Sequence, residues 1–141
     1  MQLVEKSVHL RCSVDRAFRL FTARIDEWWP PERRHLKHPA SVIALSPDRF
    51  WESAPNGDAV ELGQVQAWEP PKRIVLDWFP GTDPEHPTRV EVDFVSEGEG
   101  TSVQIKHRAG PASVDLFPLR APRYAASWDL VLQALAGASQ T

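Results

Sequence analysis

The sequence has one cysteine and no long apolar run, and these absences limit what the chain can be. Cys12 alone cannot form an internal disulfide, so nothing indicates an oxidising compartment. No apolar stretch approaches the roughly 20 residues of a membrane span. The N-terminus also lacks the apolar core and cleavage site of a signal peptide. We therefore expect a soluble, cytoplasmic protein with no membrane partner.

Acidic residues outnumber basic ones, since the sequence has 16 Lys and Arg and 19 Asp and Glu, which gives a net charge of −3. General nucleic-acid binding depends on a basic surface, so we expect no nucleic-acid partner. The chain contains no Gly-x-Ser-x-Gly elbow, no phosphate-binding glycine loop and no dinucleotide fingerprint. We expect no cofactor, and no residue is specified as a nucleophile.

What the sequence does contain is typical of one folded domain. Its 141 residues fit a single domain over 1–141, and a hydrophobic share of 42% is enough for a packed core. The 13 prolines and 6 tryptophans stand out. The prolines indicate sharp loops, and the tryptophans are large rings that must either fill a core or line a pocket.

Alternating apolar and polar residues predict seven strands. They cover residues 3–12, 40–46, 49–53, 59–69, 72–79, 88–96 and 101–108. Turn signals separate several of them, and the strongest is the Pro-Asn-Gly-Asp sequence at 55–58. The alternation directs Trp78 inward, with the apolar residues of its own strand, and Trp68 outward.

Helical spacing follows the first strand. Ser13 is a natural N-cap, and the apolar spacing behind it predicts one or two short helices over 14–29. Pro30–Pro31 should stop them. We expect residues 30–39 to form a loop.

One long amphipathic helix is predicted at the C-terminal end, from Pro122 to a stop at Gly137. Its apolar stripe consists of Tyr124, Trp128, Val131, Leu132 and Leu135. We expect residues 110–122 to be a long loop or a broken turn.

Strands that follow one another, with the helices kept apart, indicate an α+β fold. A strongly bent antiparallel sheet with the long helix across its concave face would bury every apolar stripe. Such an arrangement leaves a space between helix and sheet wherever the lining side chains do not meet.

Several short motifs support this arrangement, in the same order along nearly the whole chain. They are SVDRAFRLFT at 13–22, IDEWWP at 25–30, GQVQAWEPPKRIV at 63–75, LDW at 76–78, GTSVQIKH at 100–107 and an early Trp128 in the last helix. Together they resemble the START-like (SRPBCC) superfamily. Within it, the chain is similar to the subfamily of activators of the heat-shock-protein ATPase (AHSA-like).

The resemblance implies a helix-grip fold, in which a curved antiparallel sheet wraps around a long C-terminal helix with two short N-terminal helices. It also implies a hydrophobic ligand cavity between helix and sheet, but no particular reaction. Many relatives carry a Gly-Gly pair before the third strand, where this chain has Pro47-Asp48-Arg49-Phe50. The cavity entrance is expected to differ there.

Our leading hypothesis is that the chain binds a small hydrophobic or aromatic ligand inside this cavity. Aromatic rings can stack on such a ligand, although each could equally fill the core. The candidate ligand-binding residues are Phe21, Trp28, Trp29, Trp51, Trp78, His107, Tyr124 and Trp128.

A second hypothesis is an enzyme of the polyketide cyclase or hydrolase type, and whether the chain is an enzyme stays open. His107 lies on an apolar strand face and could act as a general base, with Glu52 as its acid partner. Lys6 could place an ammonium at the cavity rim. The alternative for His107 is a histidine satisfied within the core.

The predicted loop over 30–39 carries two histidines and several basic residues. His35 and His38, with Glu32 and His86 elsewhere, fall short of the three or four fixed ligands that zinc needs, so we expect no metal. The basic cluster of the loop could instead meet a carboxylate or phosphate on a ligand, or it could be solvated. This cluster consists of Arg33, Arg34, His35, Lys37 and His38.

A third hypothesis is a protein-interaction module such as a chaperone co-regulator. It would need an exposed patch on the outer face of the sheet, where Arg89, Glu91 and Asp93 look like ordinary solvated residues. A homodimer stays open as well, because edge strands and exposed rings need cover.

Overall fold

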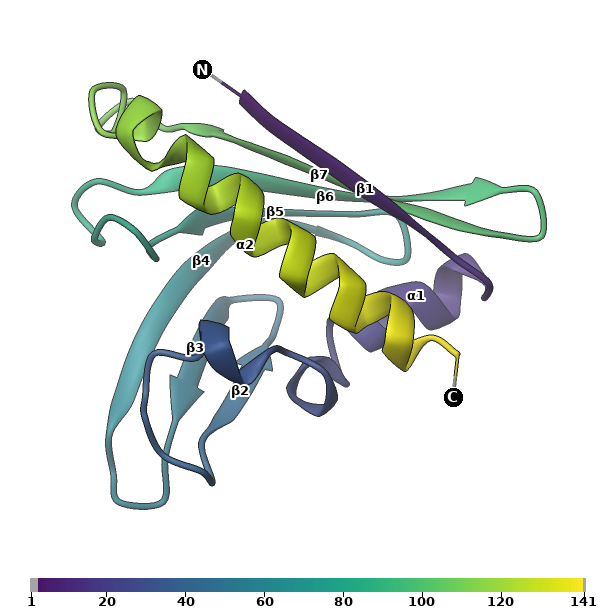
Figure 1. Ribbon diagram of the computed structural model, residues 1–141, viewed down its shortest axis with the longest axis horizontal. Coiled ribbons are helices and arrows are strands. Elements are labelled where there is room, and N and C mark those ends of the chain that lie inside the picture. The colour runs from purple at the N-terminus through teal and green to yellow at the C-terminus, as the bar shows by residue number, and fades with distance from the viewer. Residues whose placement is uncertain (1–2, 141) are drawn as a thin grey trace.

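One antiparallel sheet dominates the computed structural model, which describes residues 3–140 (Figure 1). Its strands lie in the order β1-β7-β6-β5-β4-β3-β2. Their bounds are β1 Leu3–Leu10, β2 Val42–Leu45, β3 Arg49–Ser53, β4 Ala59–Glu69, β5 Arg73–Trp78, β6 Thr88–Glu97 and β7 Gly100–Ala109. The helices are α1 Val14–Phe21, α2 Phe117–Ala138 and two 3-10 turns, η1 Ile25–Glu27 and η2 Pro31–Arg33.

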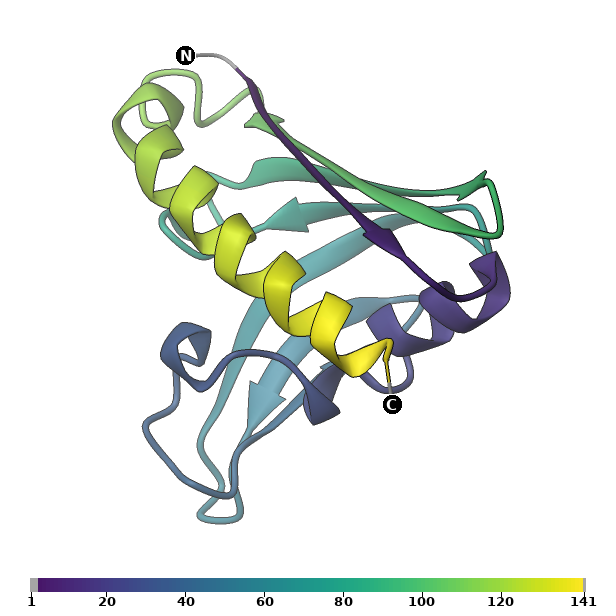
Figure 2. The same ribbon diagram turned by 45° about the vertical axis from the view of Figure 1, so that its right-hand side comes forward.

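Helix α2 lies across the concave face of this sheet (Figures 1 and 2). Strands β1 and β7 run along one side of α2, and β2 and β3 lie on its other side. The core forms between them, where Phe117, Trp128 and Leu135 of α2 are buried together with Val92 and Ile105 of the sheet. This architecture confirms the predicted α+β helix-grip fold.

The seven predicted strands are all present in the described residues, and no bound differs by more than two residues from its prediction. The alternation that predicted them is visible in β6. Val90, Val92 and Phe94 are buried in the core, while Arg89 and Asp93 are half-buried on the outer face. The two-residue period of alternation was therefore enough to predict the positions of the strands and, in β6, the buried face.

The prediction that Trp68 faces outward is wrong. A bulge after Val65 inserts one residue into β4, so that Val65 pairs with Leu76 and Trp68 pairs with Ile74. Both partners are core residues, and an inserted residue reverses the facing of all positions that follow it. Trp68 is therefore half-buried against the core, with its ring centroid 5.4 Å from that of Phe18.

The start of the long helix was also predicted wrongly. Helix α2 begins at Phe117 rather than at Pro122, so the predicted loop over 110–122 is shorter than expected. Pro118 takes the place in the first turn where a missing N–H costs least, and Pro122 lies inside the helix. Gly137 does not end the helix, which continues for one further residue.

The N-terminal helical region largely follows its prediction. Ser13 caps α1, since its Oγ accepts a hydrogen bond from the backbone N–H of Arg16 at 3.2 Å. Helix α1 and the turn η1 are the two short helical pieces. The predicted loop over 30–39 contains η2, because Pro31 stands at the first position of a helical turn, which its fixed φ favours.

Gly63 of β4 lies where a side chain has no room. A Cβ at this position would lie 2.5 Å from the carbonyl oxygen of Asp77 and 3.7 Å from the Cβ of Phe50. We predict that Gly63→Ala lowers the free energy of unfolding by about 1–3 kcal/mol, measured by urea denaturation. Gly137→Ala is the matched control, because open space surrounds its Cβ. It should raise that free energy by roughly 0.5 kcal/mol, and equal effects of both changes would contradict the close approach.

Candidate functional site

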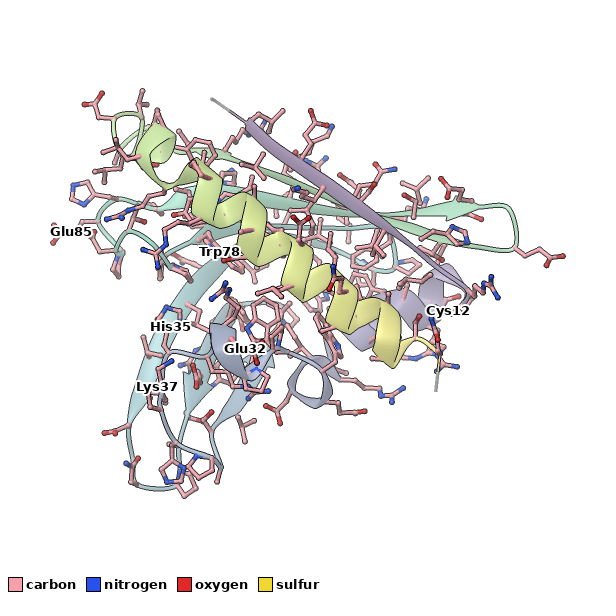
Figure 3. All side chains as sticks on the ribbon, in the orientation of Figure 1. Cys12, Glu32, His35, Lys37, Trp78 and Glu85 are labelled. Carbon is pink, nitrogen blue, oxygen red and sulfur yellow. The ribbon has the colours of Figure 1, made fainter. Side chains whose placement is uncertain are left out.

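A cavity of about 490 Å³ lies between the first half of α2, strands β3 to β5 and the segment 29–37. Its apolar lining consists of Trp29, Phe50, Leu62, Trp78, Pro80, Gly81, Trp128 and Val131, to which Tyr124 adds a ring and a hydroxyl. The polar lining consists of Glu32, Arg33, Arg34, His35, Lys37, Arg120, Arg123 and Ser127. Figure 3 shows Glu32, His35 and Lys37 on one segment, below Trp78 and α2.

Aromatic rings form the apolar wall of the cavity. The ring centroid of Trp78 lies 5.2 Å from that of Trp128 and 5.3 Å from that of Phe50. The centroid of Phe50 lies 5.6 Å from that of Trp29. These separations fall in the roughly 4.5–7 Å range of favourable ring contacts. A continuous aromatic wall of this kind is suited to bind a planar apolar ligand.

His107 lies behind this wall rather than in it. Its side chain is fully buried (0% exposed) and does not line the cavity. The indole Nε1–H of Trp128 donates to Nδ1 of His107 at 3.1 Å, and Nε2 lies 2.7 Å from Oγ1 of Thr88. An indole nitrogen can only donate, so Nδ1 accepts. The imidazole proton therefore lies on Nε2, from which it is donated to Thr88.

Burial lowers the pKa of His107 to about 3, which keeps its imidazole neutral at neutral pH. Its partners require the neutral form as well, because a proton on Nδ1 would point at the indole N–H of Trp128. Both ring nitrogens are thus occupied by the protein. The geometry gives His107 a structural role and leaves the predicted cavity base without a free nitrogen.

Glu52, the predicted acid partner of His107, serves the segment 29–37 instead. Its side chain is fully buried and accepts hydrogen bonds from the backbone N–H of His35 at 2.8 Å and of Leu36 at 3.2 Å. The carboxylate thereby fixes the segment that forms one side of the cavity. Among the described residues, no hydrogen bond joins His107 to Glu52, so the predicted acid–base pair does not form.

The eight predicted ligand-binding residues divide into four groups. Trp29, Trp78, Tyr124 and Trp128 line the cavity, and His107 lies behind it. Phe21 and Trp28 are core residues away from the cavity, and the indole Nε1–H of Trp28 donates to the carbonyl of Leu20 at 2.7 Å. Trp51 lies on the outer face of β3, where the guanidinium of Arg49 covers its ring at 4.0 Å. The structure therefore brings four of the eight together.

The remaining polar candidates lie apart from one another. Lys6 forms an ion pair with Asp129 of α2 at 3.1 Å and does not line the cavity. His86 pairs with Asp83 at 2.8 Å, and His38 Nδ1 accepts from a nearby backbone N–H. Within residues 3–140, no group of three or more His, Cys, Asp or Glu side chains is arranged to hold a metal ion.

The cavity is also lined by residues that were not among the predicted ligand-binding residues. Phe50, Leu62 and Val131 belong to apolar stripes that predict burial without distinguishing core from cavity. Arg120 fell within the stretch taken as a loop, so its position on α2 was missed, whereas Arg123 lay in the predicted helix and was not selected as a site residue. The signal that could have found them is their spacing, because both precede Ser127 on one face of a continuous helix.

His35 is the imidazole that lines the cavity. Partial burial lowers its pKa, the carboxylate of Glu52 opposes that shift, and the ammonium of Lys37 adds to it. His35 is therefore neutral at neutral pH.

Comparison with known proteins identifies the family. A family model described as "Activator of Hsp90 ATPase homolog 1-like protein" matches residues 11–138, which is most of the chain. The chain belongs to this family. A search of curated proteins found no match.

Solved structures extend this comparison. A protein from Rhodobacter sphaeroides is 16% identical with a TM-score of 0.68, over 96% of this chain and 89% of that one. DynU16, from the dynemicin biosynthetic locus, is 19% identical with a TM-score of 0.66. The match covers 100% of this chain but 48% of DynU16, so this chain spans about half of its length. At these identities the likeness shows the fold alone.

One solved structure is more similar in sequence to this AHSA1-like chain. It is Txn09, an anthrahydroquino-gamma-pyrone synthase, complexed with SUM. The two chains are 30% identical with a TM-score of 0.56, over 92% of this chain and 84% of Txn09.

The outer face of the sheet in this AHSA1-like chain carries paired charges. Glu91, predicted to be solvated, is buried to 9% exposure and forms ion pairs with Arg73 at 3.0 Å and with Arg108. Arg89 pairs with Asp77 at 3.1 Å. These pairs occupy the region in which the interaction-module hypothesis needs an exposed patch.

No helix among the described residues is long and apolar enough to cross a membrane.

The neutral state of His107 predicts a pH dependence of stability. Its pKa is about 3 in the folded chain and near 6.5 when unfolded. The stability that depends on neutral His107 is thus complete above about pH 6.5 and is lost as the pH falls toward 3. The loss should approach ~1.4 kcal/mol per pH unit.

Urea denaturation at several pH values between 4 and 7 measures this dependence, with His107→Gln as the comparison. The Gln side chain cannot titrate. As the pH falls, the free energy of unfolding of the variant should therefore decrease less steeply than that of the wild type, by ~1.4 kcal/mol less per pH unit. Equal slopes for the two proteins would show that His107 is not held neutral.

Proposed function

We propose that the chain binds a small, planar aromatic molecule in the cavity between α2 and the sheet. The observation that carries this proposal is the aromatic wall of Trp29, Phe50, Trp78 and Trp128 around a space of about 490 Å³. Ligand pockets of proteins occupy roughly 300–1,000 Å³ and are lined mainly by apolar and aromatic groups. Both properties are met here.

The rings of the wall are held in place from outside the cavity. Trp128 donates to His107, and the hydroxyl of Tyr124 donates to the carbonyl of Pro80 at 2.8 Å. The indole of Trp29 donates to the carbonyl of Arg33 at 3.4 Å. Because these polar atoms are satisfied by the protein, none of them needs a hydrogen bond from a ligand. A wall that is fixed before binding also lowers the entropic cost of binding.

The likeness to Txn09 supports an aromatic ligand. The name of that synthase denotes a fused-ring compound, and the two chains match over most of their lengths. A fused aromatic ring system would find stacking partners on the wall formed by Trp78 and Trp128. The cavity of this chain therefore supports a fused aromatic compound as the class of ligand that it shares with Txn09.

Filling the cavity tests the proposal without removing any core contact. Ser127 lines the cavity from α2, whereas its neighbour Ala126 is exposed and does not. We predict that Ser127→Trp weakens binding of polycyclic aromatic ligands at least tenfold, on the order of 1.4 kcal/mol, because the added indole occupies their space. Ala126→Trp adds the same side chain outside the cavity and should leave the affinity unchanged.

Quenching of tryptophan fluorescence during titration gives the affinities, and native mass spectrometry of gently purified protein reveals any retained molecule. Saturable binding that Ser127→Trp abolishes and Ala126→Trp preserves would support the cavity. No saturable binding across aromatic and fatty ligands, or equal effects of the two variants, would overturn the proposal.

A second candidate function is catalysis on the bound ligand, and the observation in its favour is again the likeness to a synthase. His107 and Glu52 cannot supply this chemistry, because the protein itself occupies both. His35 lines the cavity, and because burial lowers the pKa of its imidazole it can accept a proton there as a neutral base. If the chain is an enzyme, His35→Gln should abolish turnover of the ligand recovered by native mass spectrometry while its affinity persists. Unchanged turnover would remove His35 as the base.

A further inference from the structure

The cavity collects positive charge in a chain whose net charge is −3. Five basic side chains line it, and one carboxylate, Glu32, stands among them. The basic residues are Arg33, Arg34, Lys37, Arg120 and Arg123. They come from two elements, because three lie on the segment 29–37 and two lie on the first turns of α2.

One of these five charges is neutralised by the protein. Nη1 of Arg34 lies 2.7 Å from the carboxylate of Asp26, and Nη2 donates to the carbonyl of Asp26 at 2.9 Å. This arginine holds the segment to η1 and has little capacity left for a ligand. The other four have no ion pair with a carboxylate among the described residues.

Arg120 and Arg123 are one turn apart on α2 and exposed at the mouth of the cavity. Within residues 3–140, neither guanidinium has a hydrogen-bond partner. The positive charge of Arg120 reaches the wall itself, since it lowers the pKa of Tyr124 against the larger raising effect of burial.

Arg33 contributes a buried donor without a partner. Its Nε–H is removed from solvent and donates to no acceptor within the described residues. A buried donor left unpaired costs free energy, and the guanidinium of Arg33, which lines the cavity, has no carboxylate partner among the described residues. This observation is independent of the exposed arginines on α2 and points to the same kind of ligand.

We infer that the aromatic ligand of this cavity is an anion, an aromatic carboxylate whose rings lie on Trp78 and Trp128. Its carboxylate faces Arg120 and Arg123 on one side and Arg33 on the other. This inference rests on the proposed function and adds to it the charge of the ligand. Guanidinium groups bind carboxylates through paired N–H donors.

Two probes of the same ring size separate the charge of the ligand from its shape. The anionic probe is 9-anthracenecarboxylate, and the neutral probe is 9-anthracenemethanol. The full chain should bind the carboxylate about tenfold more tightly than the alcohol at low salt. Added salt should reduce this preference, because the arginines at the mouth are exposed to screening ions.

Removal of the two arginines on α2 should remove most of the preference. The variant Arg120→Gln/Arg123→Gln keeps good helix formers at both positions, so circular dichroism should show an intact fold. It should bind the carboxylate several-fold more weakly and the alcohol unchanged. Arg11→Gln/Arg19→Gln removes the same net charge from exposed sites outside the cavity and should preserve the preference.

The possible failures are distinguishable. Equal affinity for the two probes, or a preference that survives in Arg120→Gln/Arg123→Gln, would overturn the anionic ligand and leave the aromatic cavity standing. A loss of preference in Arg11→Gln/Arg19→Gln would show that net charge alone attracts the probe, and would also overturn it. Failure of both probes to bind would overturn the proposed function together with this inference.

Discussion

The hydrogen bond from the indole of Trp128 to Nδ1 of His107 is the interaction on which the rest of this structure depends. It links α2 to β7, and His107 continues the link to Thr88 of β6. The hydroxyl of Thr88 donates to the carbonyl of Trp78 at the end of β5. One chain of donors and acceptors therefore joins the helix to three strands, and every donor in it has an acceptor.

This hydrogen-bonded chain also determines what the cavity can be. It fixes the indole of Trp128 and the backbone of Trp78 from the core side, and the two rings pack against each other with their centroids 5.2 Å apart. On the opposite side, buried Glu52 anchors the backbone of His35 and Leu36. A rigid aromatic wall thus faces a rigid basic segment, and the two together favour a ligand with an aromatic body and a charged edge.

The sheet could be predicted from the sequence because each strand has only two faces, and alternation tells them apart. The same rule failed at Trp68, because a single bulge in β4 reversed the face on which the following side chains lie. The sequence of β4 contains no residue that indicates this bulge. Helix α2 was predicted too short, because Pro122 looked like a first-turn proline when Pro118 already held that place. Arg120 was therefore placed in a loop instead of on the helix.

The site was half predictable. Stripe and alternation identified Trp78, Tyr124 and Trp128 as inward-facing, but a pattern along one element cannot distinguish a ring in the core from a ring at a cavity. That distinction depends on contacts between elements, as for Phe21 and Trp28, which pack into the core. His107 shows the same limit, since its facing was predicted and its partners on other elements were not.

The most direct test of this account is nuclear magnetic resonance of the six indole N–H groups during titration with 9-anthracenecarboxylate. Three tryptophans line the cavity, namely Trp29, Trp78 and Trp128, while Trp51 and Trp68 lie away from it. If the ligand binds in the cavity, the first three signals should shift strongly and the last two should not shift. Shifts at Trp51 or Trp68 with the cavity signals unmoved would contradict it.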